Sequence, residues 1–110
     1  MGNSFPETFI LFDTRTTTGD SAVVQPRRRL DEAGIWYCYW DNASTGTWQI
    51  KLWGRLDESA EWYEIDVMNH SDGGYSLVDG VGAAVDTVPF MKAEVVAIAG
   101  GAQVSVALVD

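Results

Sequence analysis

The segment Trp48-Gln49-Ile50-Lys51-Leu52 alternates apolar and polar side chains one by one. Successive side chains of a β-strand point to opposite faces, so this alternation predicts a strand with Trp48, Ile50 and Leu52 on a core face. Gln49 and Lys51 then face water. The segment therefore predicts one layer of a β-structure that is buried on a single side.

A second alternating run, residues 61–67, predicts another strand. Tyr63, Ile65 and Val67 fall on one face, and Trp62, Glu64 and Asp66 fall on the other. Because two carboxylates are not expected to be buried without partners, we expect the first set to face the core and Trp62 to leave on the polar side.

Two more runs close the chain, residues 90–99 and 103–109, with Gly100-Gly101 between them. Paired glycines can take the positive φ angles of a tight hairpin turn, so we expect the two runs to pair antiparallel. Val104, Val106 and Leu108 are predicted to point inward.

The remaining chain repeats this organisation, with short runs rich in Val, Ile, Thr, Trp and Tyr between dense turn signals. About seven to nine short strands at this spacing predict an all-β chain folded as an antiparallel β-sandwich of jelly-roll or immunoglobulin-like type, with a small β-barrel as the alternative. We expect one domain over residues 1–110, in which residues 1–8 form either an extended arm or part of the first strand.

The composition is that of a stable acidic globule. The 110 residues include 7 basic and 16 acidic side chains, a net charge of −9, and 46% are hydrophobic. That is enough apolar surface for a core, and the negative field disfavours a nucleic-acid partner. The longest uncharged stretch, residues 95–109, is too short and too interrupted to span a bilayer, so no membrane partner is expected.

No constellation of residues points to catalysis. Cys38 is the only cysteine, which excludes an intrachain disulfide, and we expect it to be a buried core residue. His70 lies beside Ser71 and Asp72, but a catalytic triad converges from separate elements, so a turn residue is the better interpretation. The acidic residues between 57 and 66 are typical of a solvated face. We therefore expect no enzyme activity, no cofactor and no metal site.

The aromatic residues are the best candidates for binding, because all five tryptophans lie between residues 36 and 62. The run 35–40 is apolar on both faces, so its strand is either covered on both sides or has one face in a partner. A cluster of three arginines could pair with an acidic subunit or partner, and a solvated turn is the alternative for these residues. For the aromatic residues the alternative is an ordinary aromatic core. The candidate contact residues are Phe5, Arg27, Arg28, Arg29, Trp36 and Trp40.

The succession Gly46-Thr47-Trp48 to Gly54, a polar turn, and Trp62-Tyr63-Glu64-Ile65 resembles small virion structural proteins of tailed bacteriophages. Residues 88–95, a Gly-Gly turn and residues 104–108 are similar to the closing hairpin of that group. Glu58 departs from the pattern, because a turn glycine is usual there.

The resemblance implies a non-enzymatic head decoration, or cement, protein that binds the outside of the head shell and stabilises it. It implies the major capsid protein and further copies of this chain as partners, often as trimers, in a virion assembled in the host cytoplasm. A second hypothesis is a carbohydrate-binding module of a host-attachment fibre, with Trp36, Trp40, Trp53 and Trp62 as candidate stacking platforms.

Overall fold

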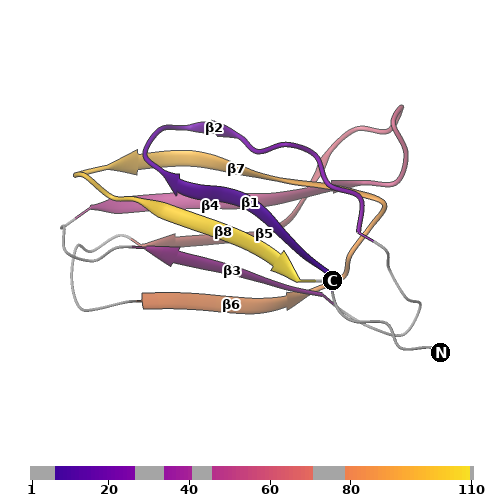
Figure 1. Ribbon diagram of the computed structural model, residues 1–110. Helices are drawn as coiled ribbons and strands as arrows, with labels where there is room; N and C mark the ends of the chain where they lie inside the picture. Colours follow the sequence, from indigo (N-terminus) through magenta and orange to yellow (C-terminus); the bar gives the residue numbers. More distant parts are fainter. Residues whose placement is uncertain (1–6, 27–33, 41–45, 71–78, 110) are drawn as a thin grey trace.

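The computed structural model describes residues 7–26, 34–40, 46–70 and 79–109, and these form a sandwich of two four-stranded antiparallel sheets (Figure 1). The predicted sandwich is confirmed, and the barrel alternative is wrong, because the described strands form no closed barrel. The β3 sheet has the order β1 (Thr8–Arg15), β8 (Val104–Val109), β3 (Gly34–Trp40), β6 (Asp79–Val85). The β4 sheet has the order β2 (Gly19–Asp20), β7 (Phe90–Ala99), β4 (Thr47–Arg55), β5 (Tyr63–His70).

The core lies between the two sheets and follows the predicted alternation of β4. Trp48, Ile50 and Leu52 are buried, and the residues between them are partly exposed. From the opposite sheet, the β8 residues predicted to point inward are fully buried; these are Val104, Val106 and Leu108. Cys38 is buried with them, as expected.

The last two strands contradict the predicted hairpin. β7 pairs with β4, whereas β8 pairs with β3 and β1 in the other sheet. Gly100 and Gly101, with φ angles of 71° and 82°, carry the chain from one sheet to the other (Figure 1). Each strand has one strongly apolar face, and in this arrangement both faces are buried against each other across the core.

The inward set predicted for β5 is also wrong in part. The register with β4 shifts between Leu52 and Trp53, so that Ile65 is an extra residue on β5. A bulge of this kind exchanges the faces of the residues beyond it. Val67 is consequently exposed, and Asp66 lies opposite the buried Leu52.

The displaced Asp66 links the two sheets. Its Oδ2 accepts a hydrogen bond of 2.9 Å from Nε1 of Trp36, a fully buried side chain of β3. The bond satisfies the indole N–H, which would otherwise be desolvated without a partner. Asp66 is therefore a half-buried carboxylate with a structural role.

Replacing Asp66 by alanine is expected to lower the free energy of unfolding by about 1–3 kcal/mol, because the buried indole N–H of Trp36 loses its acceptor. Asp66→Asn retains an acceptor oxygen and should cost clearly less. Urea denaturation of both variants measures the difference. Equal losses, or an undiminished loss in a Trp36→Phe background, would contradict the role of this bond.

Two glycines allow close packing for different reasons. A Cβ on Gly46 would overlap with the backbone of Ala102, whose Cα would be 2.7 Å away. A Cβ on Gly54 would lie 2.6 Å from methyl carbons of Ile65 and Val88, which are side-chain ends that can move.

We expect Gly46→Ala to destabilise the fold by about 1–3 kcal/mol, since the backbone of Ala102 must shift. Gly54→Ala is the matched control and should be milder. Thermal melts of the two variants give the comparison, and a Gly46→Ala protein as stable as wild type would refute the packing argument.

Candidate functional site

The predicted contact residues are only partly placed by the structure. Phe5 and Arg27, Arg28 and Arg29 lie outside the described residues, as does the side chain of Trp40. Trp36 is placed, and the prediction that it contacts a partner is wrong in this chain, because its side chain is fully buried in the core.

The outward face of β3 carries the other half of the doubly apolar run. Ile35, Tyr37 and Tyr39 point away from the core side chains Trp36 and Cys38, and Ile35 and Tyr39 are 39% and 44% exposed. β3 is therefore a central strand with one face in the core and one face that no described residue fully covers.

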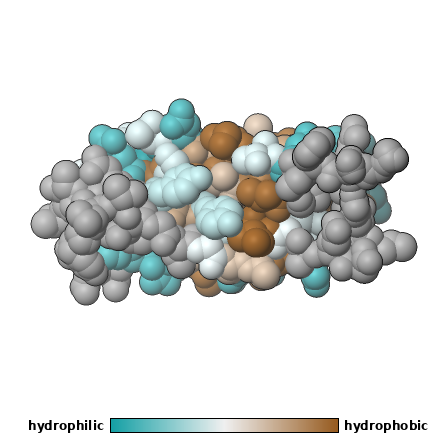
Figure 2. All heavy atoms as spheres, turned by 60° about the horizontal axis from the view of Figure 1, so that its bottom comes forward, coloured by the Kyte–Doolittle hydropathy of each residue, from teal (hydrophilic) through white to brown (hydrophobic). Residues whose placement is uncertain are grey.

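Neighbouring strands extend this apolar surface. Tyr37 lies opposite Ala107 of β8, and Ala107 lies opposite Ile10 of β1, which is 64% exposed. Val109 lies opposite Ile35 in the same way. We call the six residues Ile10, Ile35, Tyr37, Tyr39, Ala107 and Val109 the outer apolar face; Ile10, Ile35 and Tyr39 are exposed, Tyr37 and Val109 are partly buried, and Ala107 is buried. None of them is charged. The side of the molecule on which β6 lies is brought forward in Figure 2, which shows hydrophobic and near-neutral side chains gathered across its middle.

A hollow of about 230 Å³ interrupts this face between β1 and Tyr39. It arises where the register of β1 with β8 shifts twice, on either side of Phe12. Thr14, with a φ of 51°, holds the distorted strand to β8 by donating its N–H to Oγ of Ser105 at 3.0 Å. The lining is Ile10, Phe12, Asp13, Tyr39, Ser105, Val106 and Ala107, so the hollow is largely apolar.

The outer face of the β4 sheet is different, because cations cover its aromatic rings. The Arg55 guanidinium lies 4.4 Å and the Lys92 ammonium 4.6 Å from the ring centre of Trp62, and Lys51 lies 5.5 Å from that of Trp53. These are attractive cation–π contacts. Three of the four described basic residues are thus used on one face.

The two lysines are also paired with acids, and Arg55 donates to the backbone carbonyl of Glu58 at 3.1 Å. Lys51 bonds Glu64 at 3.1 Å, and Lys92 bonds Asp20 at 2.9 Å. The indole Nε1 of Trp53 donates to Glu94 at 2.9 Å. The two lysines and the Trp53 indole of this face are therefore paired, whereas the buried Nε of Arg55 has no hydrogen-bond partner among the described residues.

The described tryptophans divide between the core and this network. Trp36 and Trp48 are buried, so the stacking role considered for Trp36 is wrong. Trp53 and Trp62 are half-buried beside their cations. A sugar ring would have to displace or share these contacts.

A metal centre needs several His, Cys, Asp or Glu side chains close together in the described part of the chain. No group of three or more His, Cys, Asp or Glu side chains there could hold a metal ion. His70 ends β5 and stacks on Trp48, with ring centres 6.4 Å apart. The described residues also contain no helix long and apolar enough to cross a membrane.

Comparison of the chain with models of known families, with curated proteins and with solved structures found no match. The two outer faces and the sheet edges of this chain therefore carry the information on its function.

The sequence pointed to part of the outer apolar face and missed the rest. The doubly apolar run 35–40 predicted an unusual second face, which Ile35, Tyr37 and Tyr39 provide. Ile10 gave no such signal, since the two register shifts of β1 leave its side unreadable from alternation alone.

Burial, reinforced by the nearby Asp66 carboxylate, raises the pKa of the Cys38 thiol from 9.0 to about 12. In the unfolded chain the thiol ionises near its ordinary value, so the folded state loses stability as the pH rises between 9 and 12. We expect Cys38→Ala to remove this part of the decline. Urea midpoints of the two proteins are measured at a series of pH values. Their difference cancels the contribution of the other groups that titrate in this range.

The same burial predicts that native Cys38 reacts with a thiol reagent at pH 8 only through unfolding. Fast labelling of the native protein would show that the thiol is accessible.

Proposed function

We propose that this protein is a virion structural protein of a tailed bacteriophage, a head decoration protein that attaches to the outside of the head shell and stabilises it without catalysing a reaction. The observation that carries the proposal is the outer apolar face, in which Ile10, Ile35 and Tyr39 stay exposed. The resemblance of residues 46–109 to such proteins supplies the setting.

Leaving this face in water carries a free-energy cost. Exposed apolar side chains gathered on one face of a sheet are typical of protein contact surfaces. On the opposite outer face, by contrast, both lysines are paired with acids, and cations cover the rings of Trp53 and Trp62. One face of the sandwich is thus suited to adhesion, and the other is suited to solvent.

The net charge of −9 fits such a role, because it keeps an adhesive protein soluble before assembly. The proposed partners are the major capsid protein and further copies of the chain, with a trimer as one arrangement, in a virion assembled in the host cytoplasm. A protein that binds the assembled shell, and not the disassembled subunits, stabilises the shell by mass action.

We expect Ile10→Glu to weaken binding to purified expanded shells by about tenfold or more, because a carboxylate must then be desolvated in the interface. Leu56→Glu is the matched control, since Leu56 has the same 64% exposure as Ile10 but lies in the turn after β4. A co-sedimentation assay measures binding, and thermal melts check that both variants fold. Equal binding of the two variants, or no saturable binding by wild type, would refute the proposal.

A carbohydrate-binding module is the second candidate, favoured by the pair of half-exposed tryptophans on the β4 sheet, Trp53 and Trp62. If it holds, polysaccharides should shift or quench tryptophan fluorescence, and Trp62→Ala should abolish the response. An unchanged spectrum together with shell binding supports the decoration role instead.

A further inference from the structure

The two sheets have four edges, and three of them carry features that hinder pairing with another strand. β1 has two register shifts and a non-glycine residue, Thr14, at positive φ. β2 is only two residues long. β5 contains the bulge and carries Glu64 and Asp66. Bulges, short length and charges are the usual means by which natural sheets protect their edges.

The fourth edge, β6, lacks these features. Its seven residues pair with β3 in an unbroken register from Val85 to Asp79. It contains no proline, and its only charged residue is the first, Asp79. No described strand pairs with its other side. The small residues Gly82, Ala83 and Ala84 also leave the backbone N–H and C=O groups of this side accessible to an added strand.

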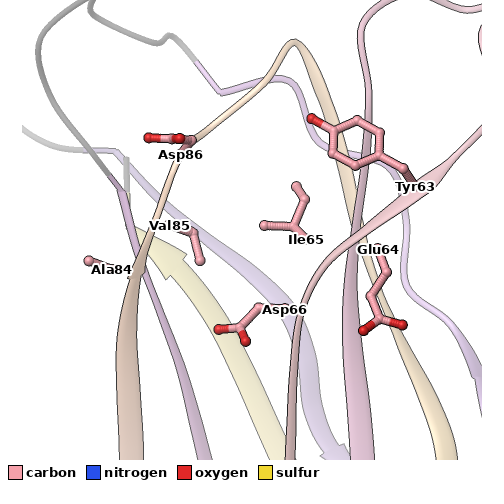
Figure 3. Close-up of a pocket in the computed structure, with 7 residues that line it drawn as sticks. All are labelled: Tyr63, Glu64, Ile65, Asp66, Ala84, Val85 and Asp86. Atoms are coloured by element: carbon pink, nitrogen blue, oxygen red, sulfur yellow. The ribbon is translucent and has the colours of Figure 1, made fainter.

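A cleft of about 440 Å³ runs beside this edge, between the two sheets. Figure 3 shows Ala84, Val85 and Asp86 on one side and residues 63–66 of β5 on the other, with Ile65 and Val85 between the carboxylates of Asp66 and Asp86. The lining contains three carboxylates and no lysine or arginine; its residues are Tyr63, Glu64, Ile65, Asp66, Ala84, Val85 and Asp86.

The three carboxylates differ in what they already bind. Glu64 pairs with Lys51, and Asp66 accepts from Trp36. Asp86 is exposed and makes no hydrogen bond or ion pair with any other described residue. The cleft can therefore receive a cationic side chain at Asp86 without breaking an existing contact.

We propose that the β6 edge binds an extended basic segment of a partner protein, which adds to the β3 sheet as a fifth strand and places a lysine or arginine side chain in the cleft beside Asp86. Backbone hydrogen bonds to β6 supply the affinity, and the acidic cleft selects the charge. The negative charge of the chain makes a second copy a poorer occupant, because two acidic clefts would then meet. Ile10 lies on β1, at the opposite edge of the same sheet, so Ile10→Glu should leave the β6 edge intact.

The test uses the full chain and a blocked ten-residue peptide that alternates lysine with threonine. We expect NMR titration to perturb the backbone amides of Gly82 to Val85 and to slow the exchange of the outward ones. Two control peptides separate the contributions: one has glutamate in place of lysine, and the other is N-methylated at alternate residues. Each should bind at least tenfold more weakly.

Protein variants give the matched evidence. Successive N–H groups of a strand point to opposite sides, so one of Ala83 and Ala84 donates toward β3 and the other points away from the sheet. Proline at the second of these positions removes no hydrogen bond to β3, and that variant is expected to remain folded. That variant should bind at least tenfold more weakly, and so should Asp86→Lys, whose exposed site does not threaten folding. Glu58→Lys, an equal charge change at an exposed residue of the turn after β4 that does not line the cleft, should bind as wild type does.

Three results would overturn the inference. The first is no binding, and the second is binding that N-methylation and Asp86→Lys leave unchanged, which would indicate diffuse attraction to an acidic protein. The third is a dimer, seen by ultracentrifugation without peptide and dissolved by the same proline, which would show that β6 pairs with a second copy. Loss of shell binding alone would refute the proposed function and leave this inference standing.

Discussion

A strand has two faces, and a two-layer sandwich has only one core to bury them in. This constraint governs every strand of the protein. In β4 it is met simply, with Trp48, Ile50 and Leu52 inside and polar residues outside. In β3 it cannot be met, because both faces are apolar, and Trp36 and Cys38 occupy the core while Ile35 and Tyr39 remain outside. The outer apolar face is a consequence of this surplus of apolar side chains on β3.

The same constraint explains why the bulge in β5 matters. Without the extra residue at Ile65, Val67 would lie inside and Asp66 outside. With it, a carboxylate is brought to the margin of the core, where it accepts the hydrogen bond of Trp36 from the opposite sheet. A one-residue shift of register therefore places Asp66 where it links the two layers. The same carboxylate raises the pKa of Cys38 further than burial alone.

The two outer faces show alternative ways of treating exposed aromatic residues. On the β4 sheet, Arg55 and Lys92 lie over Trp62, and acidic residues neutralise the lysines. On the β3 sheet, no described basic residue covers Tyr39 or Ile35, and the nearby hollow has a largely apolar lining. The β6 edge is a second such surface, because no described strand pairs with its outer side and the adjacent cleft is acidic. A partner there would have to offer backbone hydrogen-bonding groups and positive charge. The molecule thus presents two different candidate contact surfaces, both on the β3 sheet.

The sequence by itself determined the all-β class, the strand positions of β4 and β7, and the inward faces of β4 and β8, because alternation is a local property of the chain. Only the tertiary structure decided which strands pair. Gly100-Gly101 permits a hairpin and a crossing between sheets equally well, and the chain crosses because β7 and β8 each bury an apolar face across the core. Local pattern could not predict the burial of Trp36, the exposure of Ile10 or the β6 edge that no described strand covers. Each of them depends on register and on neighbours distant in sequence.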